Sequence, residues 1–400
     1  MIYVHVPFCR SFCTYCDFYS EVCGGYRKSL PGTWPPAASV QDDLFQRYTD
    51  DLCAEIRARR DEIAATAGVR TLYIGGGTPS VMPLECLQKI VEELKHAEAP
   101  VCPGRDSAES GQEFGPWEEF TIEVNPEDIV ERGPSYVEGL LALGVNRISM
   151  GVQSLDDGML RWMNRRHSAD GARKAWQILT SVRADLQKVP KMTVPPSENG
   201  GISSKSAKND GSPSHREVGL SLSIDLISGV PGMDCMMLGQ TLTEVLEWRP
   251  EHISAYQLSV EEGSALATMI ARGQVAELPD EECRAQYDLL CRRLAAAGYH
   301  HYEISNWALP GHEAKHNSAY WTRQPYVGLG PGAHSLEISG SRQIRKWNSQ
   351  QTTGWKEEGR EVLTAEEIRE ESVMLLARTD RGPIPERDWF VADDLIADLL

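Results

Sequence analysis

Residues 2–18 read IYVHVPFCRSFCTYCDF and place Cys9, Cys13 and Cys16 in a C-x3-C-x2-C pattern directly after a strand-like run. Three thiolates in one tight loop suit iron–sulfur chemistry, because soft sulfur ligands favour iron clusters. They would fill three corners of a four-iron cluster and leave the fourth iron open to an outside ligand. The spacing therefore predicts a [4Fe–4S] cluster with one exchangeable position.

A zinc site is the alternative for the same loop, with His5 or Cys23 as its fourth ligand. Zinc sites usually present paired C-x2-C units, or a second group of cysteines and histidines further along the chain. Here the remaining cysteines are scattered singly, at Cys53, Cys86, Cys102, Cys235, Cys283 and Cys291. The pattern therefore favours the cluster.

The composition limits the class of protein. The chain has 400 residues, of which 41% are hydrophobic, enough for one large core with or without a small appended domain. The formal net charge of −18 argues against binding along nucleic-acid phosphates. No run of 18 apolar residues and no charged-then-apolar leader is found, so we expect no membrane span and no export. Ten cysteines without such a leader predict a cytoplasmic protein.

Strand-like and helix-like segments alternate along the chain. The expected strands cover residues 2–6, 71–74, 120–124, 147–152, 220–227 and 253–257. The expected helices cover residues 44–65, 84–97, 136–143, 169–182, 236–248 and 281–297. Strands separated by helices predict an α/β fold with a parallel sheet, because parallel neighbours need crossover connections. Six strands are too few for a closed eight-stranded barrel.

Three segments interrupt this alternation, at residues 23–39, 99–115 and 190–216. They are rich in glycine, proline, serine and charge and have no period, so we expect surface insertions. The second contains Cys102-Pro103, a dipeptide found at some regulatory heme sites, although an ordinary loop thiol is the simpler interpretation.

A glycine stretch, Gly75-Gly76-Gly77-Thr78-Pro79, follows the second expected strand. Parallel α/β folds bind ligands where strands end, and glycines allow the backbone to approach a ligand closely. A simple tight turn is the alternative. Glu123 ends the third strand, in TIEVNPED, where it would face the same site or cap the next helix. Both features predict a ligand site beside the cysteine loop.

Together, the cysteine pattern and GGGTP resemble the radical S-adenosylmethionine (SAM) superfamily. The resemblance implies an open, partial (β/α)6 barrel of the TIM type, and a [4Fe–4S] cluster whose open iron binds SAM and can split it. The blocks NRISMGVQSLDDGMLRWMNRRH (146–167) and DLISGVPGM (225–233) resemble a narrower branch. This branch contains the oxygen-independent coproporphyrinogen III oxidases and the HemW-type heme chaperones.

The resemblance assigns roles to individual residues. It implies that Cys9, Cys13 and Cys16 ligate the cluster and that Tyr3, Gly76 and Glu123 contact the cluster-bound SAM. Whether a second SAM binds stays open, and the positions that hold it in the oxidases match Tyr15, Gly77, Thr78, Gln153, Arg165 and Asp225. Without the resemblance, Arg165 and Asp225 would be ordinary solvated or paired charges.

Two features separate the chaperones from the oxidases. The oxidases commonly carry a fourth cysteine where this chain has Phe18, and an extension before the first strand. The motif HNSAYW (316–321) resembles the heme-binding segment of the chaperones, with His316 as the axial ligand. A neutral imidazole binds heme iron well, and aromatic side chains cover a porphyrin face. Packing at a domain junction is the alternative for this motif.

The expected organisation has three parts. Residues 1–240 would form the radical SAM core with its three insertions, and residues 241–340 would complete the barrel and contain the heme-binding segment. Residues 341–400 would form a small, truncated helical domain like the C-terminal domain of HemN. The resemblance implies a chaperone that binds heme and delivers it to membrane respiratory enzymes. The alternatives are oxidative decarboxylation of coproporphyrinogen III in porphyrin biosynthesis, and an interaction protein with a degenerate metal loop.

Overall fold

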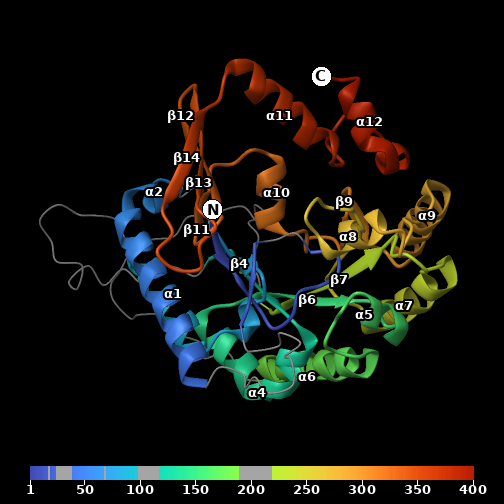
Figure 1. The fold of residues 1–400 in the computed structure, drawn as a ribbon, viewed down its shortest axis with the longest axis horizontal. Helices are drawn as coiled ribbons and strands as arrows, with labels where there is room; N and C mark the ends of the chain where they lie inside the picture. Colours follow the sequence, from blue (N-terminus) through green and yellow to red (C-terminus); the bar gives the residue numbers. More distant parts are fainter. Residues whose placement is uncertain (17–18, 24–37, 67–68, 98–116, 189–218) are drawn as a thin grey trace, which may run out of the picture.

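A nine-stranded sheet with the order β11-β1-β4-β5-β6-β7-β8-β10-β9 forms the centre of the molecule (Figure 1). The computed structural model describes residues 1–16, 19–23, 38–66, 69–97, 117–188 and 219–400, without the side chains of 38–41 and 187–188. Six consecutive strands are parallel: β1 (Ile2–Val6), β4 (Thr71–Gly76), β5 (Glu119–Val124), β6 (Arg147–Gln153), β7 (Ser221–Ser228) and β8 (His252–Gln257). They are the six predicted strands, and they confirm the open (β/α)6 barrel.

Three further strands extend this sheet at its edges. The strand β11 (Val327–Leu329) pairs parallel to β1, and β10 (Asn306–Ala308) pairs antiparallel to β8 and to β9 (His300–Glu303). Two short strands, β2 (Phe8–Cys9) and β3 (Glu21–Val22), pair at the start of the cysteine loop.

Helices follow the parallel strands as crossover connections. They are α1 (Ala38–Ala58), α2 (Arg60–Ala65), α3 (Leu84–Ala97), α4 (Pro126–Leu143), α5 (Asp157–Trp162), α6 (Ala169–Lys188), α7 (Cys235–Trp248), α8 (Ala265–Ala271) and α9 (Asp280–Ala296). The helix expected over 44–65 is two helices that meet at Arg59. Helix α4 begins ten residues before the expected start, at Pro126, because proline is well placed in a first helical turn. None of the described helices has the length and apolar character needed to cross a bilayer.

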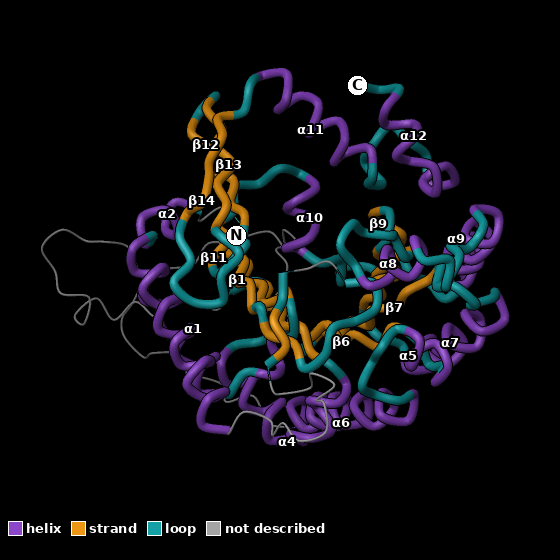
Figure 2. The backbone as a smooth tube through the Cα atoms, viewed as in Figure 1, coloured by secondary structure: helices purple, strands orange, loops and turns teal. Residues whose placement is uncertain are grey.

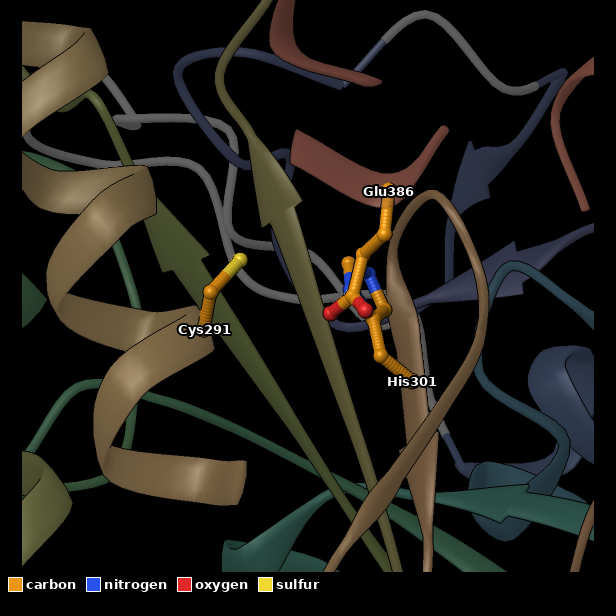
Figure 3. Close-up of side chains that lie close together, drawn as sticks. All are labelled: Cys291, His301 and Glu386. Carbon is orange, nitrogen blue, oxygen red and sulfur yellow. The ribbon is translucent and has the colours of Figure 1, made fainter. Parts of the chain in front are cut away.

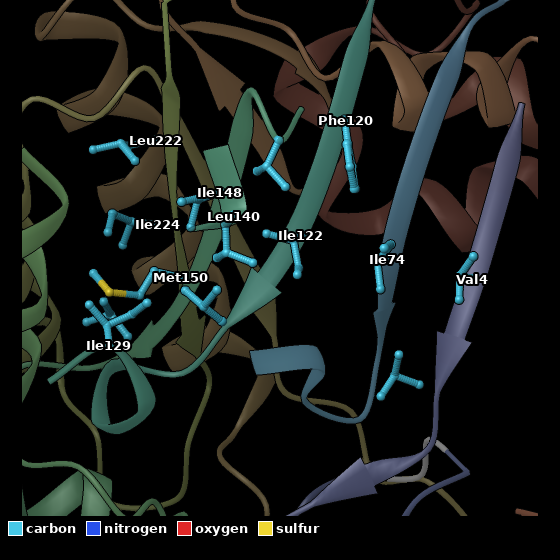
Figure 4. Packing of buried hydrophobic residues seen from close by; sticks show 14 of the residues in the cluster. Val4, Ile74, Phe120, Ile122, Ile129, Leu140, Ile148, Met150, Leu222 and Ile224 are labelled. Carbon is cyan, nitrogen blue, oxygen red and sulfur yellow. The ribbon is translucent and has the colours of Figure 1, made fainter. Parts of the chain in front are cut away.

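Apolar and polar side chains alternate along most of the length of the parallel strands, with Leu226–Ile227 in β7 as an exception. Those that face the helices are apolar and buried, as Figure 4 shows for Val4, Ile74, Ile122, Ile148 and Ile224. Those between them are polar and face the barrel interior, among them Tyr73, Glu123, Ser149 and Asp225. Because side chains on a strand alternate between its two faces, one sequence pattern builds both the core and a polar interior. A polar barrel interior is suited to holding a ligand.

The C-terminal part begins with a second sheet that the sequence analysis missed. The strands β12 (His334–Ser339), β13 (Arg342–Asn348) and β14 (Glu357–Val362) are antiparallel, with a tight hairpin at Gly340. The expected boundary at 340/341 thus falls within this hairpin. The side chain of Glu55 in α1 accepts hydrogen bonds from Gly330, Asn348 and Trp355, which fastens this part to the barrel.

Helices complete the C-terminal part, as predicted. The short helix α10 (Lys315–Trp321) precedes the second sheet, and α11 (Ala365–Ala377), η2 (Glu386–Val391) and α12 (Ala392–Ala397) follow it (Figure 2). The insertions expected at 99–115 and 190–216 lie outside the described residues, as do most of 23–39, Phe18 and Cys102. The three-part division of the chain stays a prediction.

Candidate functional site

A cavity of about 600 Å³ lies at the carboxyl ends of the parallel strands. The register of the sheet brings two loops together there, because β1 pairs with β4 so that Val6 lies opposite Gly76. The Gly77 N–H donates to the Val6 carbonyl at 2.7 Å, and the Thr78 N–H donates to the Phe8 carbonyl at 2.6 Å. The glycine stretch is thereby bonded to the chain that carries the cysteines. We call this space the strand-end cavity.

Most of the predicted site residues line the strand-end cavity. They are Cys9, Cys13, Tyr15, Cys16, Gly76, Gly77, Thr78, Glu123, Gln153, Arg165 and Asp225. Tyr3 does not line it, because its hydroxyl is turned to the Nδ1 atom of His5, at 3.0 Å. His316 does not line it either. The structure therefore assembles eleven of the thirteen predicted residues around one space.

Polar side chains of the cavity contact two of the cysteine sulfur atoms. The Arg165 guanidinium donates to Cys13 Sγ at 3.4 Å, and the Thr78 hydroxyl lies 3.5 Å from Cys9 Sγ. Burial raises the pKa of the Cys9 thiol, and the nearby Thr78 and Arg165 oppose that rise. The guanidinium would therefore balance negative charge on sulfur ligands.

Both residues considered as the fourth ligand of a zinc site, His5 and Cys23, have other partners within the protein. The Nε2 atom of His5 lies 2.9 Å from the Tyr19 carbonyl, which only accepts, so Nε2 carries the proton and Nδ1 accepts from Tyr3. Cys23 Sγ is turned to the Cys9 carbonyl, at 3.4 Å, and is absent from the cavity lining. Among the described residues, the three loop thiols do not form a group of ligand atoms within 4.8 Å, as a single ion would need.

Two carboxyl groups lie deep in the strand-end cavity. Glu123 accepts from the Tyr73 hydroxyl at 2.6 Å and from the Gly76 N–H at 3.1 Å. Asp225 accepts from the Ser149 hydroxyl at 2.9 Å. Burial raises the pKa of Glu123 to about 7, with a further rise from the nearby Asp225, and burial raises the pKa of Asp225 to about 6. Additional hydrogen-bond donors from a ligand would restore the charged forms.

We predict a pH-dependent stability from Glu123. Between its ordinary pKa of 4.5 and about 7, the folded chain holds a proton that the unfolded chain releases, so stability falls as the pH rises through this range. The loss should be at most about 3 kcal/mol. Urea unfolding of the SAM-free protein should show that Glu123→Gln reduces this slope, while the raised pKa values of Asp225 and Glu303 leave part of it. The exposed Glu262→Gln should keep the full slope, and equal slopes in all three proteins would contradict the prediction.

The fold itself requires glycine at position 76, in addition to the predicted contact with SAM. Its φ is +108°, and a Cβ atom there would lie 2.5 Å from His5 Nδ1. A side chain would therefore strike the protein before it reached a ligand. Gln153, at the end of β6, also has a left-handed backbone, with φ of 64°, and its side chain lines the cavity. Such strain is common where a site needs a particular side-chain direction.

We predict that Gly76→Ala destabilises the fold itself. The left-handed backbone alone costs about 1–2 kcal/mol with a Cβ atom, and the contact with His5 adds to it. Gly298→Ala is the matched control, since Gly298 has φ of +86° and nothing within 4 Å of its Cβ position. Chemical unfolding should show a clearly larger loss for Gly76→Ala. Equal losses would mean that the His5 contact relaxes freely.

The residues around the strand-end cavity fit a cluster and SAM. Three thiols come from one loop, and the buried Nε atom of Arg165 beside them has no hydrogen-bond partner among the described residues. Cys9, Cys13 and Cys16 would hold the cluster. Glu123 would accept hydrogen bonds from polar groups of SAM, and these bonds would oppose the rise in its pKa that burial causes.

His316 lies at the opposite end of the barrel. The N–H groups of Lys315 and His316, at the start of α10, donate to the Glu119 carboxylate at 2.9 and 2.8 Å. The His316 ring contacts the Thr71 hydroxyl at 2.8 Å and the Tyr320 hydroxyl at 3.4 Å. Thr71 and Glu119 are the first residues of their strands. His316 is only 2% exposed, and burial lowers its pKa to about 3. The ring is therefore neutral but enclosed.

Sequence analysis missed several residues that complete the cavity. Tyr73 and Ser149 bond to the two carboxyl groups, and Asn125 bonds to both Thr78 and Arg165. The sequence could have revealed Tyr73 and Ser149. Each lies on an expected strand, two residues from another position that faces the barrel interior, and side chains two residues apart on a strand share a face. Asn125 stands two residues after Glu123, just beyond the strand end.

Comparisons with known proteins show the family to which this chain is similar. The model of the family described as "Radical SAM superfamily" matches residues 3–199 of this chain. The chain is 31% identical over 340 residues to "Heme chaperone HemW" of Synechocystis sp., covering 85% of this chain and 66% of that protein. It is 28% identical over 387 residues to "Heme chaperone HemW" of Bacillus subtilis, covering 94% of this chain and 83% of that protein.

A solved structure supports the fold. The structure titled "Coproporphyrinogen III oxidase (HemN) from Escherichia coli is a Radical SAM enzyme" matches 100% of this chain and 81% of that chain. Its TM-score is 0.64, and its sequence identity is 20%. The cysteine loop and the glycine stretch meet at the strand ends of this barrel. The chain belongs to the radical SAM superfamily.

Proposed function

We propose that this protein is a heme chaperone of the HemW type. It would act in the cytoplasm, bind heme together with a SAM-ligated [4Fe–4S] cluster, and deliver heme to membrane respiratory enzymes. The observation that carries the proposal is the match to a protein named "Heme chaperone HemW" along 94% of this chain. Phe18, at the position where the oxidases commonly have a further cysteine, supports the chaperone over the oxidase.

The chain's own residues have distinct parts in this function. Cys9, Cys13 and Cys16 would hold the cluster, and Gly76 and Glu123 would position SAM. When bound, the cluster and SAM supply one-electron chemistry. The side chains of the strand-end cavity contribute charge balance through Arg165 and hydrogen-bond acceptors through Glu123 and Asp225. The roles of individual residues rest on their place in the cavity and on the family pattern.

One side chain connects the cavity with the proposed heme segment. The Tyr73 hydroxyl donates a hydrogen bond to Glu123, and the centre of the Tyr73 ring lies 5.2 Å from the centre of the His316 ring. Heme ligation by His316 would require α10 to move, because both ring nitrogens have partners within the protein. Movement of His316 would therefore release one face of Tyr73.

We predict that SAM changes the heme affinity and that Tyr73→Phe reduces this effect. Coupling between two sites is typically about 5–150-fold in affinity. Heme titrations with and without SAM should give different affinities for the original protein. In Tyr73→Phe the two affinities should approach each other, because the bond to Glu123 is lost. An unchanged ratio would show that Tyr73 does not transmit the effect.

An anaerobic assay tests the proposed function. The cluster-loaded protein is titrated with heme and, separately, incubated with coproporphyrinogen III, SAM and a reductant. A chaperone should shift the Soret band of heme and form no vinyl products. Turnover of coproporphyrinogen III without heme binding would instead establish the oxidase.

A further inference from the structure

Three side chains from three separate elements meet beside β9, away from the strand-end cavity (Figure 3). Cys291 comes from α9, His301 from β9 and Glu386 from η2. Their ligand atoms all lie within 4.8 Å of one another, and no other group of three within the described ranges does so. We propose that Cys291, His301 and Glu386 bind one zinc ion or a similar divalent transition-metal ion.

The imidazole of His301 has an orientation typical of a metal ligand. Its Nε2 atom lies 3.3 Å from the Ile304 carbonyl, and its Nδ1 atom lies 2.9 Å from Glu386 Oε1. A carbonyl only accepts, so Nε2 carries the proton, as in metal sites where a backbone carbonyl orients the ligating ring. The Nδ1 lone pair then faces a carboxylate, and two acceptors repel unless a cation lies between them. A metal ion or a second proton would meet that need.

The ring is also held rigidly. It is stacked on the ring of Trp307, with centroids 4.0 Å apart and 12° between the planes, and the Trp389 ring meets it edge-on at 4.5 Å. His301 is only 6% exposed. Ligands whose rotamers are fixed by packing lose little entropy when a metal binds. The site is therefore preorganised at its central ligand.

The three ligand types favour zinc. Thiolate sulfur, imidazole nitrogen and carboxylate oxygen are the donors that zinc uses, and three of them leave one position open. A cavity of about 400 Å³ adjoins the site and is lined by His301, Glu386, Asp380 and Trp389, which leaves room for a water molecule as the fourth ligand.

A bound ion would fasten the C-terminal segment to the barrel. Two backbone bonds already join them, from the Ile304 N–H to the Arg378 carbonyl at 3.0 Å and from the Asp380 N–H to the Tyr302 carbonyl at 3.2 Å. Glu386 stands six residues beyond Asp380 on the same segment. Metal ligation would thus stabilise the docking of η2 on α9 and β9.

Zinc K-edge X-ray absorption on the cluster-loaded protein tests the proposal, because iron does not contribute at this edge. With one equivalent of zinc, the first shell should contain one sulfur, together with nitrogen and oxygen. In Cys291→Ser the sulfur should be missing from this shell. In a chelator competition, Cys291→Ser and Glu386→Gln should each weaken zinc binding about tenfold or more. Cys283→Ser, on the same helix, is the matched control and should change neither measurement.

Two outcomes would overturn the proposal. A shell of several sulfurs that persists in Cys291→Ser would place the ion in the Cys9–Cys13–Cys16 loop. No zinc uptake by the cluster-loaded protein would mean that His301 and Glu386 share only a proton. Because Cys291 is partly exposed and serine is close in size, the variant should fold, and circular dichroism would verify this.

Discussion

Replacing Cys9, Cys13 and Cys16 together with alanine should abolish the EPR signal of the reduced cluster after anaerobic reconstitution. The three thiols line one cavity, and no other cysteine among the described residues lines it. Without them, iron would have no thiolate ligand in that space. Because the triple variant would remove every proposed thiolate ligand at once, the loss should be complete rather than partial.

Cys23→Ser is the matched control for this experiment. Cys23 belongs to the same segment, but its sulfur is turned to the Cys9 carbonyl and is buried with 5% exposure. This variant should keep the EPR signal. A surviving signal in the triple variant, or a lost one in Cys23→Ser, would contradict the proposed ligand set.

Replacing His316 with alanine should remove or shift the Soret band that forms when the purified protein is mixed with heme. Removing the imidazole would leave the iron without its nitrogen ligand. Because burial lowers the pKa of His316, its ring is neutral, and the neutral imidazole is the form that binds iron. The same variant should keep its iron–sulfur absorbance, because His316 lies at the amino-terminal ends of the strands and the thiols lie at the carboxyl ends.

His312→Ala provides the control, since His312 is exposed and lies four residues earlier. It should leave the Soret band unchanged. An identical band in the original protein and in His316→Ala would show that heme binds through another residue. Cys102, outside the described residues, is the next candidate.

The sequence by itself determined the barrel and the content of its main site. Six strands were predicted within a few residues, because apolar and polar side chains alternate along them and helices separate them. The cysteine loop and the glycine stretch were recognisable because their chemistry depends on local spacing. Their meeting in space also followed from the sequence, since parallel strands end at the same edge of a sheet. The β12–β13 hairpin was missed although Gly340 marks its turn.

Only the tertiary structure decided the features that depend on distant parts of the chain. His316 was expected to face a ligand, but Thr71 and Glu119, about 200 residues or more away, enclose it. The side chain that a Cβ atom at Gly76 would strike belongs to His5 on another strand. The Cys291–His301–Glu386 group has no sequence spacing that would reveal it. Local patterns specify secondary structure and short loops, whereas contacts across the barrel arise from packing that no short pattern encodes.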